Sequence, residues 1–141
     1  MTAMEETVET VDTVADLPRE IVILGGLEPF PHERYRVSEE PDAPPFLRIQ
    51  TVDDDLVFHV LDPFLVLDNY EPAIGDEDDR LLGLTGVADT RLLVIVNLSK
   101  GASQATVNLA APIVVNRKTG RAKQVILQNA TQYSVRHKLF G

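Results

Sequence analysis

The chain has 141 residues and a mass of 15.6 kDa, with 44% hydrophobic and 25% charged residues, which is typical of one globular domain. It contains no cysteine, which excludes disulfides, thiolate metal sites and a cysteine nucleophile. No apolar run approaches the ~20 residues of a membrane-spanning helix, so no membrane segment is expected. Because the formal net charge is −9, direct binding to the phosphate backbone of a nucleic acid is not expected either.

The charge is divided unevenly along the chain. All 22 acidic residues lie within 1–90, whereas 91–141 hold eight of the 13 basic residues and no acidic one. This polarity favours a protein partner, although a small fold that mixes the two segments in space would average it out. Residues 1–18 are acidic, rich in threonine and without a steady hydrophobic period, so we expect a flexible, solvated arm there. The arm has no basic start, which argues against a secretory signal peptide.

Downstream of this arm, short apolar segments alternate with turn residues, the pattern of a β-domain. The first segment, 20–24, ends at Gly25 and Gly26, which supply the positive φ values of a turn. The segment 92–98 begins with five apolar residues in a row, which predicts a central strand buried on both faces. The stretch 75–84 is the one credible helix, because its first turn carries the carboxylates that a helix dipole favours. The other expected strands are 34–37, 46–51, 56–61, 64–70, 105–109, 112–116, 122–128 and 133–136.

Nine or ten short strands and one short helix predict an all-β fold, either an antiparallel sandwich or a small closed barrel. The three histidines, His32, His59 and His137, have no ligand-spaced neighbours. The acidic runs 53–55 and 76–79 lack the alternating order of a calcium loop. Signatures of serine hydrolases, phosphate loops and dinucleotide folds are missing as well. We therefore expect neither an enzyme nor a metal or cofactor site.

Polar side chains are dense in the C-terminal strands. Amides in such places either satisfy backbone groups at strand ends or present a hydrogen-bonding surface to another polypeptide. The residues concerned are Asn97, Asn108, Asn116, Lys123, Gln124, Gln128 and Asn129.

The same region carries an ordered series of motifs. An N-L-x-A-P segment begins at Asn108, an N-x-K-T-x-x-x-K-Q-V-I-L hairpin spans 116–127, and a Tyr-Ser pair begins at Tyr133. This order closely resembles the C-terminal signature of the flagellar assembly factor FliW family. Upstream, 46–74 is similar to the central hairpin of that family, with its D-P-F element at 62–64.

The resemblance covers about 20–139 and departs from the family pattern at two places. The early G-x-P-G-F turn is here G-L-E-P-F over 26–30, with the proline displaced and the second glycine absent. The acidic arm over 1–18 lies outside the pattern. A partner contact made by the early turn would be affected by the first departure.

The resemblance implies a FliW-like β-barrel domain over 19–141 that is cytoplasmic and works by partner switching without enzymatic activity. Members of the family bind newly made flagellin, for which we expect the C-terminal region as the contact. They also bind the RNA-binding translational regulator CsrA (carbon storage regulator), and this capture relieves repression of flagellin translation. The alternative is a structural or chaperone-only flagellar component without a translational role.

We expect partner contacts around the hairpin 116–124, because the family motif and hydrogen-bonding side chains coincide there. The alternative for each of these side chains is a purely structural role. An acidic surface on 53–55 and 76–79 is the candidate contact for a basic partner such as CsrA. The candidate partner-binding residues are Asn108, Asn116, Lys118, Lys123, Gln124, Tyr133 and Arg136.

Overall fold

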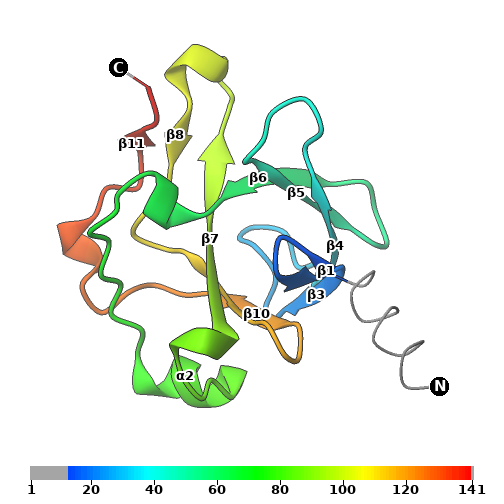
Figure 1. Cartoon of the computed structure of the whole chain (residues 1–141), viewed down its shortest axis with the longest axis vertical. Coiled ribbons are helices and arrows are strands. Elements are labelled where there is room, and N and C mark those ends of the chain that lie inside the picture. Colours follow the sequence, from blue (N-terminus) through cyan, green and yellow to red (C-terminus); the bar gives the residue numbers. More distant parts are fainter. Residues whose placement is uncertain (1–12, 141) are drawn as a thin grey trace.

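Seven strands close into a barrel in the computed structural model, which describes residues 13–140 (Figure 1). In order around the barrel they are β7 (Thr90–Asn97), β6 (Val57–Leu61), β5 (Leu47–Thr51), β4 (Arg34–Glu39), β3 (Glu20–Ile23), β10 (Arg121–Gln124) and β9 (Ile113–Asn116). Neighbouring strands are antiparallel, except β3 and β10, which run parallel. Pairing of β7 with β9 closes the ring. The all-β, barrel-like fold is confirmed, with one parallel pair in an otherwise antiparallel sheet.

The sheet continues beyond the barrel at the far end of β7. There β8 (Thr106–Val107) pairs with β7, and β11 (His137–Lys138) pairs with β8. β7 is buried on both faces, because Leu93 lies in the core of the barrel and Val94 lies in a second core outside it. The prediction from its apolar run is therefore confirmed.

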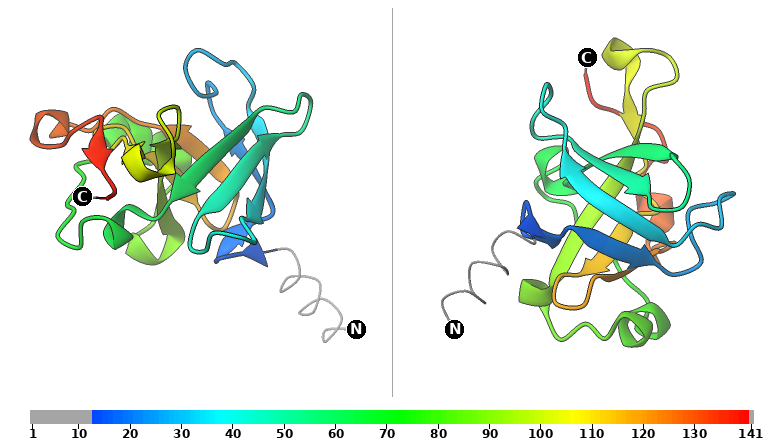
Figure 2. Two further views of the ribbon diagram at one scale, coloured as in Figure 1. Left: turned by 90° about the horizontal axis from the view of Figure 1, so that it is seen from above. Right: turned by 90° about the vertical axis from the view of Figure 1, so that its right-hand side faces the viewer.

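The second core lies outside the barrel, where α2 (Asp76–Leu82) and the 63–74 segment pack with the C-terminal segment over β7 and β9 (Figure 2). The expected helix is confirmed. It starts after Gly75 and ends at Gly83, whose φ of 65° is the left-handed value that favours glycine. Among residues 13–140, no helix is long and apolar enough to cross a bilayer.

The strand expected over 64–70 is wrong, because this segment leaves the sheet. The Oδ1 atom of Asp62 accepts a hydrogen bond of 2.9 Å from the backbone N–H of Phe64, which caps a 3-10 turn, η1 (Pro63–Leu65). The first residue of this turn is a proline, which has no N–H to give to a strand ladder. The chain then runs irregularly to Tyr70, whose buried ring joins the second core.

The strand expected over 133–136 is also wrong, since β11 begins just after it. The hydroxyl of Ser134 accepts a hydrogen bond of 3.0 Å from the backbone N–H of Arg136, so this stretch turns instead of extending. The strand expected over 122–128 is shorter than predicted and ends at Gln124.

The last six residues of the arm expected over 1–18 belong to the packed structure. β1 (Thr13–Val14) pairs with β2 (Leu17–Pro18) as a small hairpin. The side chain of Leu17 is fully buried in the core of the barrel, which anchors the hairpin there. The rest of the arm, 1–12, lies outside the described residues.

Candidate partner-binding site

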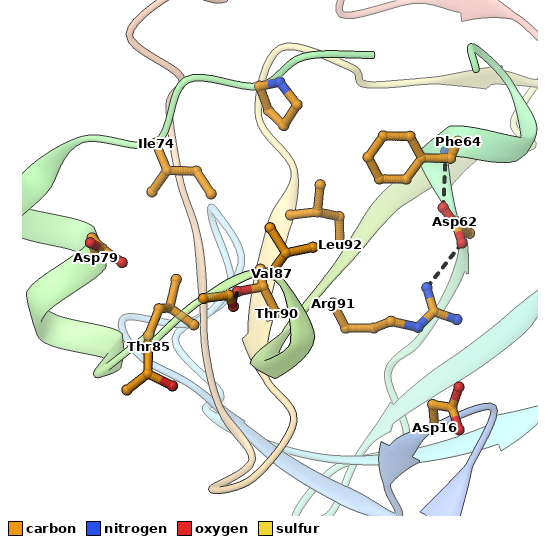
Figure 3. Close-up of a pocket in the computed structure, with 13 residues that line it drawn as sticks. Asp16, Asp62, Phe64, Ile74, Asp79, Thr85, Val87, Thr90, Arg91 and Leu92 are labelled. Carbon is orange, nitrogen blue, oxygen red and sulfur yellow. Dashed lines mark hydrogen bonds and ion pairs between the residues drawn. The ribbon is translucent and has the colours of Figure 1, made fainter. Parts of the chain in front are cut away.

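An open groove of about 850 Å³ lies between α2 and the start of β7 (Figure 3). Its walls come from the segment that follows β6, from the loop before α2 and from the loop between α2 and β7, which follow one another along the chain, while Asp16 reaches it from the N-terminal hairpin. The apolar side chains that line it are Phe64, Pro72, Ile74, Leu84, Val87 and Leu92.

Two of these apolar side chains are open to solvent. Phe64 is 45% exposed, and Val87, at the start of the 3-10 turn η2 (Val87–Asp89), is 91% exposed. When a partner covers apolar surface in a concave site, that surface is removed from water, and this lowers the free energy of the complex. The groove is therefore suited to receive apolar side chains of another molecule.

An ion pair borders the groove on the side of the barrel. The Nη1 atom of Arg91 donates to Oδ2 of Asp62 over 3.1 Å, while Oδ1 of Asp62 holds the N–H of Phe64 (Figure 3). The Nη2 atom of Arg91 also donates to the carbonyl of Ala15 over 3.4 Å. Asp62 thus links β7 to η1 and fixes the backbone that carries Phe64.

Asp89 anchors the loop that carries Val87. Its largely buried carboxylate accepts a hydrogen bond from the hydroxyl of Thr85 and lies 3.4 Å from Nζ of Lys118. Its carbonyl accepts a hydrogen bond of 2.7 Å from the N–H of Arg117. The β9–β10 hairpin, which carries the family motif, therefore holds one wall of the groove in place.

Asn116, one of the candidate residues, is buried and serves the fold. Its Nδ2 atom donates to the carbonyls of Leu82 at 2.9 Å and Gly83 at 3.3 Å, at the end of α2. Its Oδ1 atom accepts from the N–H groups of Lys118 at 2.9 Å and Thr119 at 3.3 Å. Asn116 joins the helix to the hairpin, so its side chain is not available to a partner.

Lys123, Gln124 and Asn108 also have partners within the fold. The Nζ atom of Lys123 donates to Oδ1 of Asp78 on α2, over 2.5 Å. Gln124 donates through Nε2 to the carbonyl of Ala111 at 3.2 Å, and the N–H of Ala111 donates to Oδ1 of Asn108 at 3.1 Å. These contacts fix α2 and the turn after β8, while all three side chains stay partly exposed.

Tyr133 packs edge-on against Tyr70, with ring centroids 4.8 Å apart. Its hydroxyl accepts a hydrogen bond of 2.8 Å from the N–H of Glu71, and the hydroxyl of Tyr70 donates to the carbonyl of Leu109 over 2.6 Å. Burial, and then the neighbouring Tyr133, raise the pKa of Tyr70 well above its ordinary value. Tyr133 therefore ties the backbone at Glu71 to the C-terminal part of the chain.

Arg136 lies apart from the other candidates, beside Asn97 in a small separate pocket. The structure thus places Asn116, Lys118 and Lys123 next to α2 and its following loop, but it does not gather the seven candidates into one surface. Lys118 is the most open of the group next to α2, with 73% of its side chain exposed.

Sequence reasoning misses Phe64, Ile74 and Val87 as site residues. Their gathering depends on how η1, α2 and η2 pack, which no local pattern shows. The one available signal is the Asp62-Pro63 pair, which ends β6 and starts η1.

The two acidic runs do not form one surface. Residues 53–55 form the turn between β5 and β6, whereas 76–79 lie in α2, and Figure 1 shows the two on different sides of the molecule. Within 13–140, no group of three or more histidines and carboxylates is placed to hold a metal ion.

The molecule has the features of a binding protein, because its closed β-barrel carries an open groove in which two apolar side chains face solvent. The family model described as FliW protein matches residues 5–139. The chain therefore belongs to the FliW family, and the resemblance of its C-terminal motifs is confirmed. The expectation that the arm over 1–18 lies outside the family pattern is wrong, because the match begins at residue 5.

Named relatives agree with this assignment. The flagellar assembly factor FliW of Bacillus subtilis (strain 168) is 35% identical over 98 residues, which cover 69% of this chain and 68% of the relative. That of Geobacillus kaustophilus (strain HTA426) is 35% identical over 116 residues, covering 82% and 80%. A crystal structure of the flagellar assembly factor FliW is similar with a TM-score of 0.79 at 31% identity, and the match covers 87% of this chain and 86% of that one.

Replacing Asn116 tests its structural role. We expect Asn116→Ala to lower the free energy of unfolding by about 2–4 kcal/mol, because it leaves buried backbone donors and acceptors of the helix end and the hairpin unpaired. Asn116→Asp, which keeps the acceptor but loses the donor, should also be destabilised. Urea unfolding followed by circular dichroism measures both.

The matched control is Asn69→Ala, in an exposed loop position, which should change the free energy of unfolding by less than about 0.5 kcal/mol. If Asn116→Ala behaved like this control, the side chain would not be holding the helix to the hairpin.

Proposed function

We propose that this protein acts in flagellar assembly as a cytoplasmic binding protein without a catalytic step. It binds the C-terminal region of flagellin and antagonises the translational regulator CsrA by partner switching. Membership of the FliW family supports the flagellar role. The observation that carries the mechanism is the apolar groove, with the acidic helix α2 beside it.

The groove is the proposed contact for flagellin. It is open along the surface, and its exposed Phe64 and Val87 offer apolar area that water covers in the free protein. An extended or helical segment of a partner can place its apolar side chains there, which is a recurrent mode of peptide recognition. The carboxylate of Asp62 at the edge is paired with Arg91, so it is not an unpaired charge beside these apolar side chains.

Helix α2 is the proposed contact for CsrA. Its exposed acidic side chains, Asp76, Glu77 and Asp79, face solvent, while Lys123 neutralises Asp78. An acidic face attracts a basic RNA-binding protein and repels the RNA that competes for it.

The two contacts meet at α2, which supports the switching. Asp79 belongs to the acidic face and also lines the groove. A segment seated in the groove therefore lies against the helix that CsrA would touch. Binding of one partner is expected to weaken binding of the other by direct overlap.

Calorimetric titration tests the switching. The protein is titrated with a peptide from the flagellin C-terminus, then with CsrA, and then with each in the presence of saturating amounts of the other. We expect both to bind, and the second partner to bind at least about tenfold more weakly than alone, a difference of about 1.4 kcal/mol. Binding of flagellin without CsrA would leave the chaperone-only alternative, and independent binding of both would contradict switching.

A charge placed in the groove tests the flagellin contact. We expect Val87→Asp to lower the affinity for the flagellin peptide at least about tenfold, because the bound peptide would desolvate an unpaired carboxylate. Val87 is 91% exposed, so the fold should be unaffected. The control is Val135→Asp, at another exposed valine outside the groove. Equal peptide affinities for the two variants would place flagellin elsewhere.

Neutralising α2 tests the CsrA contact. We expect the double change Asp76→Asn and Glu77→Gln to lower the affinity for CsrA about fivefold at low salt, because exposed charge pairs each contribute about 0.5 kcal/mol. The affinity of the variant should also depend less on salt, because ions screen such pairs. The matched control is Asp53→Asn with Asp55→Asn, in the other acidic run. Loss of affinity in the control instead of the α2 variant would move CsrA to the β5–β6 turn.

A further inference from the structure

A second concave site lies at the opposite end of β7 from the groove. It is a pocket of about 250 Å³ at the three-stranded extension formed by β7, β8 and β11, which Figure 1 shows far from α2. Its lining is entirely polar or basic: Asn97, Ser99, Lys100, Gln104, Thr106 and Arg136.

The strand register explains why these side chains share one face. Asn97 pairs with Thr106 across β7 and β8, and Thr106 pairs with Lys138 across β8 and β11. Cross-strand partners lie on the same side of a sheet. The adjacent pair, Val96 and Val107, faces the second core on the other side. The polar face is therefore the outer face of the extension.

The two cations of the pocket have no anionic partner in the described part of the chain. Lys100 and Arg136 are exposed and take part in none of the ion pairs found among residues 13–140, whereas Arg91, Lys118 and Lys123 are each paired with an aspartate. No acidic residue occurs in 91–141, so the segments that build the pocket contribute positive charge only.

The neutral side chains of the pocket add hydrogen-bond donors. The Oδ1 atom of Asn97 accepts from the N–H of Ser99 over 2.9 Å, which leaves its amide N–H groups to donate. Gln104 and Thr106 bring another amide and a hydroxyl. An arginine fork, an ammonium group and these donors are the groups that bind a planar carboxylate.

We propose that this pocket binds a carboxylate of an acidic segment in a partner protein. A nucleic acid fits less well, because a polyphosphate chain would extend over a protein with a net charge of −9. The volume suits one side chain or one chain terminus. This inference stands on the pocket alone and holds whether or not flagellin and CsrA bind at the groove and α2.

NMR titration with the peptide acetyl-Glu-Glu-Glu-amide tests the proposal on the full chain. We expect saturable shifts of the backbone amides of Lys100, Gln104 and Arg136, and none with acetyl-Lys-Lys-Lys-amide. The double change Lys100→Gln and Arg136→Gln should lower the affinity for the acidic peptide at least about tenfold, since it removes both charge-assisted contacts.

The matched control is Arg36→Gln with Arg80→Gln, which removes the same charge from exposed positions outside the pocket and should leave the peptide affinity unchanged. If both variants lost the same affinity for the acidic peptide, the effect would come from the net charge of the protein, and the proposal would be overturned. Absence of saturable shifts would overturn it as well. Tighter binding of inorganic phosphate or a short single-stranded RNA at the same amides would assign the pocket to phosphate instead.

Discussion

The structure depends on the burial of β7 on both of its faces. Its apolar side chains alternate between the core of the barrel and the second core, and its edges pair with β6 on one side and with β9 and β8 on the other. A one-residue shift in the register of this strand would move each of its side chains into the other core, so its pairing fixes both cores relative to each other. The groove at its start and the basic pocket at its end are therefore held on one rigid element.

The residues of the family motif have a structural role in this arrangement. The β9–β10 hairpin reaches the end of α2 through Asn116 and the middle of the helix through Lys123. It also reaches the loop of Val87 through the contacts of Asp89. The motif suggested a contact surface, but most of its side chains support the groove from within the fold. These contacts hold the groove in place before any partner binds.

Much of the fold could be predicted from local patterns, and the errors have physical causes. The apolar run of β7 and the glycines around α2 determine their structure locally. The 64–70 segment has strand-like spacing, but the cap of Asp62 on Phe64 turns it away from the sheet. The partners of Asn116 are carbonyls at the end of α2, more than 30 positions earlier. The groove depends on how η1, α2 and η2 pack against one another. Side-chain contacts between residues so far apart in the sequence cannot be predicted from the local sequence pattern.

The parallel pair of β3 and β10 has a consequence for how the chain reaches this structure. Val22 pairs with Arg121, so the ring joins two strands that are separated by most of the described residues 13–140. Contacts of such high sequence separation form late, because a long loop must be ordered first. During synthesis β3 therefore presents an unpaired edge until the C-terminal hairpin is available. The barrel closes only after β10 has been translated, so the newly made protein passes through an interval in which its sheet is open to association with other chains.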